Sequence, residues 1–316
     1  MEDKLEGRKK ISILAACYNE EENVIVLCER IRNVFSQLPS YDWELVFIDN
    51  ASVDATVDCI KKEIQKDKHI RLIINARNFG VIRSGFYGLT QCYGDAVVPM
   101  ASDLQDPPEI ILEFVKKWEE GYKIVVGVKN KSRESPFMFV VRKFFYNLMS
   151  KMSDSEQIKN FTGFGLYDKK FMDILRNIED PYPYFRGLVA ELGFERAEVE
   201  FVQPQRERGK SSYNFYRLYD TAMLGFVNHS KIPLRLASFI GFITAVLSLV
   251  AAVVYFIYKL IYWDTFSAGT APLVIGLFFF SAVQLFFIGI IGEYVGAIHT
   301  QVRKRPLVVE KERVNF

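Results

Sequence analysis

The sequence has few of the residues that most often build metal centres and nucleophile sites. Among 316 residues there are only three histidines and four cysteines. The cysteines lie in the first third of the chain, without a CxxC pair and without a histidine close by in sequence, so a zinc site is not expected. Free thiols of a reduced compartment are the simpler interpretation, and the histidines are expected to be structural or solvated. These residues are Cys17, Cys28, Cys59, Cys92, His69, His229 and His299.

Several other signals are also missing from the sequence. It contains no Gly-rich phosphate loop, no GxGxxG fingerprint and no internal repeat. The formal net charge is only +2, which does not indicate a nucleic-acid-binding protein. Residues 1–10 are charged and lack an apolar stretch, which argues against a signal peptide and predicts a cytosolic N-terminal domain.

Long apolar runs are present near the C-terminus. Residues 236–258 and 271–292 contain no charged side chain, and each run exceeds the roughly 20 residues that a helix needs to cross a bilayer. We therefore expect a transmembrane pair. Cations flank the pair, whereas the connecting loop 263–270 has one acid and no base, so both termini are predicted to be cytoplasmic. The flanking cations are Lys231, Arg235, Arg303, Lys304 and Arg305.

Two segments rich in aromatic residues are candidates for helices at the membrane surface. Residues 137–151 set Phe and Met among cations, and an interfacial helix and an ordinary core-facing helix explain them equally well. Residues 213–231 lead into the first apolar run, and here the interfacial interpretation is favoured. Glycines in the apolar segments favour helix packing between protomers and hence a homo-oligomer. They are Gly241, Gly276, Gly289, Gly292 and Gly296.

Between Ile11 and Val128, short apolar runs alternate with amphipathic stretches. This alternation is typical of βαβ units that build a mostly parallel sheet, so the predicted fold class is α/β. Strands are predicted at residues 11–16, 43–49, 70–75, 96–101 and 123–127. Helices are predicted at residues 21–37, 54–65, 81–92 and 108–120.

Polar clusters directly follow the predicted strands, at residues 18–23, 49–52, 78–80 and 102–109. An open α/β sheet binds its ligand at this edge. Asp103 and Gln105 are two residues apart in an extended turn, and both can offer an oxygen to one Mg²⁺ or Mn²⁺. An ion at this place could be held against a diphosphate, which indicates nucleotide-sugar chemistry. Asp106 is either a weaker metal candidate or an N-cap-like residue before the helix that Pro107 begins.

Two basic groups are suited to phosphates. Residues 206–213 contain three bases and a glycine just before the second aromatic segment, and binding of lipid head groups, binding of substrate phosphates and simple solvation all remain open. The second group follows the last predicted strand, where it could meet a lipid phosphate. Its members are Lys129, Lys131, Arg133 and Arg142.

Taken together and in this order, these motifs resemble those of the family 2 glycosyltransferases, and more closely those of the polyprenyl-phosphate glycosyltransferases. The segments that carry the resemblance are 18–23, 49–52, 78–80, 102–109 and 206–213. The likeness extends from Ile11 through the apolar pair. It implies a GT-A fold and an inverting transfer of a sugar from a nucleotide diphosphate to a lipid monophosphate.

The resemblance also implies roles for individual residues. The nucleotide would be bound by Tyr18, Glu20, Asp49, Asn78 and Ser102. The metal, Mg²⁺ or Mn²⁺, would be held by Asp103 and Gln105. Catalysis would fall to Asp103, Arg206, Lys129 and Arg133. The acceptor phosphate or lipid would contact Arg142, Arg208, Lys210 and Ser211.

Some positions depart from the family pattern. The first acid of the DxD pair is Ala101, the second Asp of the DDGS motif is Asn50, and the lysine after the loop serine is Ser212. An Asp that many relatives carry in a DFRL segment is Gly163. A missing general base is tolerable, because a phosphate monoester is largely dianionic at neutral pH and attacks without losing a proton.

The predicted organisation has four parts: a cytoplasmic GT-A domain in 1–212, an interfacial helix in 213–231, a two-helix transmembrane hairpin in 232–302 and a cytoplasmic basic tail in 303–316. The expected reaction transfers glucose from UDP-glucose to undecaprenyl phosphate at the cytoplasmic face of the plasma membrane, for cell-envelope glycan modification. Another UDP- or GDP-sugar, or dolichyl phosphate, is an alternative. A non-catalytic membrane protein that binds sugar-lipids is an alternative of a different class.

Overall fold

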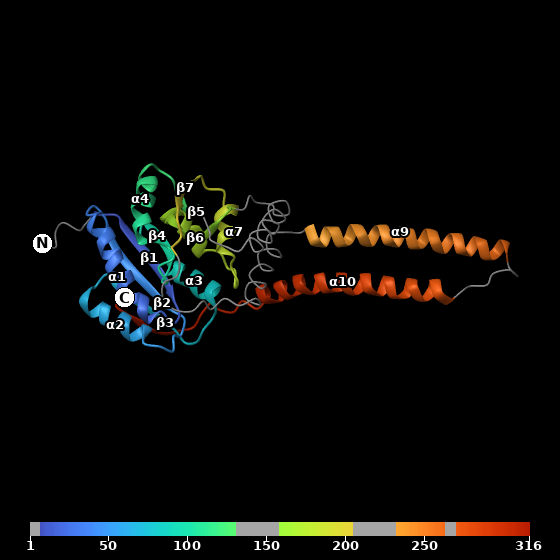
Figure 1. The fold of residues 1–316 in the computed structure, drawn as a ribbon, viewed down its shortest axis with the longest axis horizontal. Coiled ribbons are helices and arrows are strands. Elements are labelled where there is room, and N and C mark those ends of the chain that lie inside the picture. The colour runs from blue at the N-terminus through green and yellow to red at the C-terminus, as the bar shows by residue number, and fades with distance from the viewer. Residues whose placement is uncertain (1–6, 131–157, 205–231, 263–269) are drawn as a thin grey trace.

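The computed structural model describes residues 7–130, 158–204, 232–262 and 270–316. Its centre is an eight-stranded sheet with the order β7-β5-β6-β4-β1-β2-β3-β8 (Figure 1). All strands run in one direction except β6 and β8, which are antiparallel to their neighbours. The strands are β1 Lys10–Cys17, β2 Asp42–Asp49, β3 Ile70–Asn75, β4 Ala96–Ala101, β5 Ile124–Lys129, β6 Phe161–Asp168, β7 Arg196–Phe201 and β8 Glu310–Val314.

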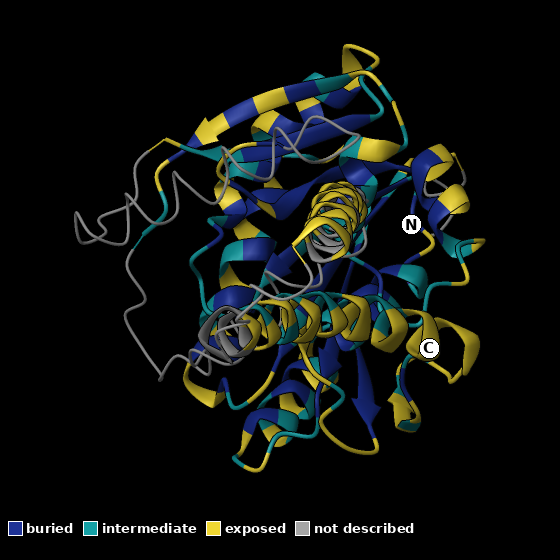
Figure 2. Cartoon of the chain, turned by 90° about the vertical axis from the view of Figure 1, so that its right-hand side faces the viewer, coloured by how far each residue is buried: buried dark blue, intermediate teal, exposed yellow. Residues whose placement is uncertain are grey.

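Helices cover both faces of this sheet, and successive strand residues point to opposite faces, so there are two hydrophobic cores. Ile13 and Phe47 face one core with α1, α2 and α4, whereas Leu14 and Ile48 face the other with α3, α6 and α7. The inner strands of the sheet are largely buried on both faces, whereas the edge strands β7 and β8 carry exposed residues (Figure 2). The helices of the domain are α1 Glu21–Ser36, α2 Thr56–Lys66, α3 Val81–Thr90, η1 Pro108–Ile110, α4 Ile111–Glu119, α6 Lys169–Arg176 and α7 Phe185–Glu191.

The α/β class and the mostly parallel sheet are confirmed, with element ends within a few residues of the prediction.

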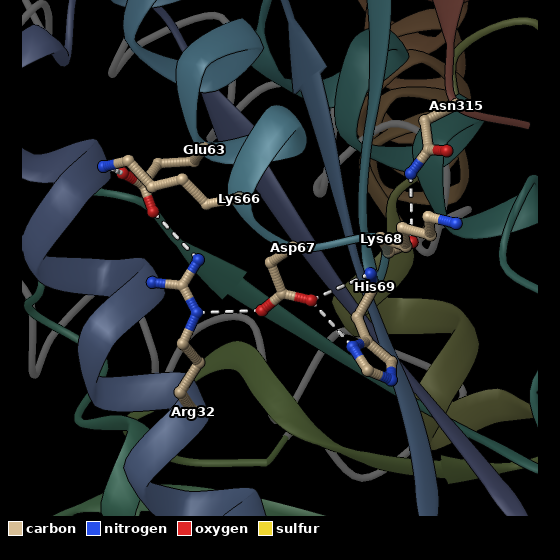
Figure 3. Close-up of polar contacts among 7 residues, drawn as sticks. All are labelled: Arg32, Glu63, Lys66, Asp67, Lys68, His69 and Asn315. Carbon is tan, nitrogen blue, oxygen red and sulfur yellow. Dashed lines mark hydrogen bonds and ion pairs between the residues drawn. The ribbon is translucent and has the colours of Figure 1, made fainter. Parts of the chain in front are cut away.

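A polar network fixes α1 to the end of α2. Arg32 donates to Glu63 and Asp67, each at 2.8 Å, and Asp67 also contacts the Nδ1 atom of His69 at 2.7 Å (Figure 3). His69 therefore has the structural role expected of it.

Two long helices, α9 (Ile232–Ile261) and α10 (Thr270–Val302), extend away from the domain (Figure 1). A groove lined by side chains of both helices lies between them. Among the described residues, one helical stretch, Phe279–Val302, is long and apolar enough to cross a membrane. It begins and ends later than the predicted second span at 271–292. The predicted interfacial segments 137–151 and 213–231 lie outside the described residues.

The C-terminal tail is more than a basic extension. After α10 the chain returns to the domain, and β8 pairs antiparallel with β3 at the edge of the sheet. The sequence analysis missed this strand, as it missed β6 and β7. Most residues of β8 are exposed and it has no apolar run, so its pattern does not indicate a strand.

Candidate functional site

The polar segments that follow the first four strands meet at one edge of the sheet. The parallel register aligns Cys17 with Asp49, Asp49 with Ile74, and Ala16 with Ala101. Four parallel strands therefore end at nearly the same level, and the turns after them lie next to one another. This is the edge at which open α/β sheets bind ligands.

Asp49 ends β2 and is fully buried. Its carboxylate accepts the Ser52 N–H at 3.0 Å and a short hydrogen bond from the Ser52 hydroxyl. Burial raises the pKa of Asp49, and the hydrogen bonds from Ser52 and Ala51 oppose this rise. Ala51 has φ 61°, a left-handed conformation that disfavours a side chain with a Cβ. The carboxylate thus fixes a strained turn at the edge of the site.

The turn after β1 is tied to the turn after β2. Asn19, with φ 57°, accepts the Val53 N–H at 2.9 Å, and the Glu20 N–H donates to the Thr56 hydroxyl at 2.8 Å. The buried Glu20 carboxylate accepts from the Asn23 amide at 2.6 Å and so fixes the start of α1. Tyr18 is the exposed residue of this turn, with 36% of its surface accessible.

An amide network that the sequence analysis did not identify lies after β2 and β3. Asn50 donates to the Asn78 side-chain oxygen at 3.0 Å and accepts the Phe79 N–H at 2.9 Å. Asn75 donates to Asn50 at 3.2 Å and to the Ser84 hydroxyl at 2.9 Å. Asn50 both donates and accepts, which an ionised carboxylate cannot do. The departure from the family Asp at position 50 therefore has a structural reason in this chain.

The turn after β4 holds the predicted metal residues. The Asp103 carboxylate accepts the Gln105 N–H at 3.1 Å, and Leu104 between them has φ 62°. The buried Ser102 hydroxyl donates to the Ala16 carbonyl at 2.8 Å, so Ser102 joins this turn to β1.

Asp106 does not cap a helix, which corrects one of the two roles considered for it. Its carboxylate instead accepts the Ala101 N–H at 3.0 Å and closes the turn, and the next helix begins at Pro108. The pKa of Asp106 is raised to about 6. Burial and the nearby Asp103 carboxylate raise this pKa, whereas the hydrogen bond from the Ala101 N–H and the charge of Lys129 lower it.

A cleft of about 430 Å³ opens beside this turn. Apolar residues of β1, β4, α3 and β6 form most of its wall, and Gly163, with φ 107°, is among them. Its polar lining residues are Gln105, Asp106, Lys129, Thr162, Arg186 and Gln203. Lys129, at the end of β5, donates to Gln203 at 2.6 Å. Asp103 is not part of the cleft lining.

The structure thus brings together two groups of the predicted residues. Gln105 and Lys129 share the cleft, whereas Tyr18, Glu20, Asp49, Asn78 and Ser102 lie at or beside the strand ends. Six predicted residues lie outside the described part of the chain: Arg133, Arg142, Arg206, Arg208, Lys210 and Ser211. The sequence analysis did not single out Arg186, Gln203, Asn50 or Asn75 as site residues. Asn50 and Asn75 carry a detectable signal, because each lies at a strand end.

The sequence model of Glycosyl transferase family 2 matches residues 12–175, and the chain belongs to this family. Its mostly parallel sheet with polar strand ends is accordingly that of a GT-A-like glycosyltransferase. An uncharacterized glycosyltransferase of Bacillus subtilis, YkcC, is 32% identical over 94% of this chain and 92% of its own. The SfII prophage-derived bactoprenol glucosyl transferase of Shigella flexneri is 31% identical over 96% of this chain and 98% of its own.

Among solved structures, a similar chain is the mannosyltransferase PcManGT of Pyrobaculum calidifontis, in complex with GDP-Man and Mn²⁺. It is 16% identical, with a TM-score of 0.49, over 94% of this chain and 87% of that one.

Proposed function

We propose that this glycosyltransferase moves a sugar from a nucleoside diphosphate to a polyprenyl phosphate at a membrane surface. The observation that carries the proposal is full-length similarity to bactoprenol glucosyl transferases, over 96% of this chain. The row of polar turns and the adjoining apolar cleft support it, because a polar donor and an apolar acceptor must meet at one place.

The nucleotide end of the donor is assigned to the turns after β1, β2 and β3. Tyr18 offers an exposed aromatic face for the base, and the buried Asp49 is positioned to shape the turn against which the nucleoside packs. Asn78 is held by Asn50, so its position is preorganised for a contact with the donor.

Asp103 and Gln105 are assigned to the divalent ion. They supply hard oxygen donors in one turn, which suits Mg²⁺ or Mn²⁺, because these ions take one or two protein carboxylates together with phosphate oxygens and water. No group of three or more His, Cys, Asp and Glu side chains suited to a metal is found in the described residues. When bound, the ion neutralises charge on the departing diphosphate.

The reaction proposed is a single displacement with inversion. A lipid phosphate oxygen forms the new bond to the anomeric carbon while the bond from that carbon to the nucleoside diphosphate breaks. The lipid phosphate is largely dianionic at neutral pH, so no base has to remove a proton, and Gly163 is compatible with turnover. Lys129 at the cleft is suited to hold a phosphate in line, and Arg133, Arg206 and the acceptor residues Arg142, Arg208, Lys210 and Ser211 are proposed to help it.

The membrane assignment extends the candidate span in α10 to both long helices. We place α9 and α10 across the plasma membrane, with the α/β domain and both chain ends on the cytoplasmic side, because the cations flank the helix pair. Glycines along both helices, Gly241 in α9 and Gly276, Gly289, Gly292 and Gly296 in α10, are the basis for proposing that helices of neighbouring protomers pack together.

The test incubates the detergent-purified protein with Mn²⁺ or Mg²⁺, undecaprenyl phosphate and a panel of labelled UDP- and GDP-sugars. Label from UDP-glucose is expected in the lipid phase. Because the proposed transfer inverts the anomeric carbon, an α-linked donor should give a β-linked sugar on the lipid phosphate. Transfer from a different donor would correct the sugar, and activity with dolichyl phosphate alone would correct the acceptor. Nucleotide binding without transfer to any lipid would contradict the proposal and favour a non-catalytic sugar-lipid binding protein.

The non-catalytic candidate has its own support. Ala101 and Gly163 replace two acidic residues of the family pattern, and both line the cleft. Asp103→Asn should abolish transfer while leaving the thermal unfolding of the protein unchanged, because Asp103 is only partly buried.

A further inference from the structure

The segment after α10 holds the loop 76–80 from two sides. This loop joins β3 to α3 and carries Asn78, which Asn50 fixes at 3.0 Å. Before the loop, the tail pairs with β3, and the Ala76 N–H donates to the Val309 carbonyl at 2.8 Å. The backbone at the first residue of the loop is therefore hydrogen-bonded to the tail.

After the loop, the tail contacts α3. The Tyr87 hydroxyl donates to Glu310 at 2.8 Å, and Arg313 donates to Glu310 and to Gln91, each at 2.6 Å. Arg83, in the first turn of α3, donates to the Pro306 carbonyl at 2.5 Å. One segment of the tail thus fixes both the strand that enters the loop and the helix that leaves it.

The far end of the tail is also anchored. The Asn315 amide donates to the Lys68 carbonyl at 3.0 Å, just before β3 (Figure 3). It also donates to the carbonyl of Ile70, the first residue of β3, at 2.7 Å. The apolar Val308 is 94% buried, since 6% of its surface is accessible, and Leu307 packs against the core that α3 covers. Four separate attachments make this a docked strand, unlike a solvated basic tail.

We propose that the tail 306–316 is a positioning element for donor binding: it sets the loop 76–80, and through Asn78 the affinity for the nucleotide. The inference rests on the proposed function in one respect, the assignment of the nucleotide to this edge of the sheet. It adds that the segment which follows the membrane-spanning candidate α10 takes part in donor recognition without touching the donor. Seven residues, 303–309, lie between the end of α10 at Val302 and Glu310, so the helix and the loop are joined by a short path.

The chain offers a matched pair of variants for the test. Arg313→Ala removes two hydrogen bonds from the tail to α3 and its C-cap, one to Gln91 at 2.6 Å and one to the Tyr87 hydroxyl at 3.4 Å. It also removes the contact within the tail that holds Glu310, the acceptor of the Tyr87 hydroxyl. Glu312→Ala, on the same strand, removes an exposed ion pair with Lys61 of α2 and does not touch the loop. Arg313→Lys is the conservative variant, which keeps the charge beside Glu310 but loses the forked geometry.

Two readouts on the full-length protein in detergent separate the inference from the proposed function. The hydrogen-exchange rates of the amides in 76–80 measure how strongly the tail restrains the loop. Calorimetric titration with UDP, and separately with GDP, in the presence of Mn²⁺ reports donor-site affinity. In Arg313→Ala, hydrogen exchange in the loop should become about tenfold faster, because about two hydrogen bonds are lost. The Kd should rise by a similar factor for whichever nucleotide the parent protein binds. Arg313→Lys should recover part of both, and Glu312→Ala should match the parent.

Each other outcome has a definite meaning. Unchanged exchange in Arg313→Ala, or equal changes in Glu312→Ala, overturns the positioning role while the proposed function stands. Faster exchange with unchanged nucleotide affinity overturns the link to donor binding. Failure of both nucleotides to bind the parent protein overturns the proposed function, and the exchange measurement still decides whether the tail sets the loop. If Arg313→Ala unfolds, Tyr87→Phe removes a single hydrogen bond to Glu310 and tests the same contact.

Discussion

Replacement of Asn50 by the acid that the family pattern favours tests the amide network directly. In the structure, Asn50 is a donor toward Asn78 at 3.0 Å and an acceptor from Phe79 and Asn75. In Asn50→Asp the acceptor function survives, but the ionised carboxylate has no proton for Asn78. If the Asn78 amide rotates to donate, the Gly80 N–H loses the acceptor that it now reaches at 2.9 Å. One hydrogen bond is lost in either arrangement.

The magnitude follows from burial. Residue 50 is 94% buried, since 6% of its surface is accessible, and a buried polar group left without its partner costs about 1–3 kcal/mol. A domain of this size shifts its melting temperature by about 2–4 °C for each kcal/mol, so we expect Tm to fall by about 2–12 °C at pH 7.5. The nucleotide Kd should rise as well, because Asn78 is no longer fixed.

The pH dependence gives the refuting experiment. Burial is expected to raise the folded-state pKa of the new carboxyl above its unfolded value, so its protonated form favours folding at low pH and this contribution is lost as pH rises through the folded pKa. A protonated acid can also donate to Asn78. The difference in Tm between Asn50→Asp and the parent should therefore shrink from pH 7.5 to pH 5, measured by thermal unfolding in detergent. A variant as stable as the parent at pH 7.5, or a difference that grows at low pH, would refute the reasoning.

Three further predictions address the metal, the fold and the missing acid. Asp103→Asn should weaken Mn²⁺ binding by more than about tenfold and leave Tm unchanged. Mn²⁺ binding is measured by electron paramagnetic resonance in the presence of nucleotide, and an unaltered affinity would contradict the metal assignment. Asp168 accepts hydrogen bonds from the Trp118 indole at 2.8 Å and from Lys123 at 3.2 Å. Burial alone would raise the pKa of Asp168, but its hydrogen bonds outweigh this effect and lower the pKa. Asp168→Ala should therefore reduce the free energy of unfolding, measured with denaturant, by about 1–3 kcal/mol at pH 7 and by progressively less as pH falls through the folded-state pKa. Gly163→Asp should lower Tm and not raise kcat, because φ is 107° there and the phosphate nucleophile needs no base; a faster variant would show that a base was limiting.

Much of the α/β domain was predictable because its signals are local. The apolar runs that became β1 to β5 are strands buried on both faces, and each is followed by a polar turn whose position the sequence displays. The antiparallel β6 was not predicted because Gly163 and Gly165 interrupt its strand pattern, and its place between β4 and β5 is set by the fold. The exposed strand β8 was missed for a related reason: its stability comes from β3 and α3, more than two hundred residues away.

The family, the α/β class, the apolar C-terminal helices and the candidate residues at the strand ends were predictable without a structure, because periodicity and motif order are properties of neighbouring residues. Which of those residues meet depends on the three-dimensional fold. It joined Asn50 to both Asn78 and Asn75, turned Asp106 inward to hold Ala101, and placed Gln105 in the cleft with Lys129. These outcomes depend on strand register, and such long-range pairings are fixed by packing and hydrogen bonds between segments that are distant in the chain.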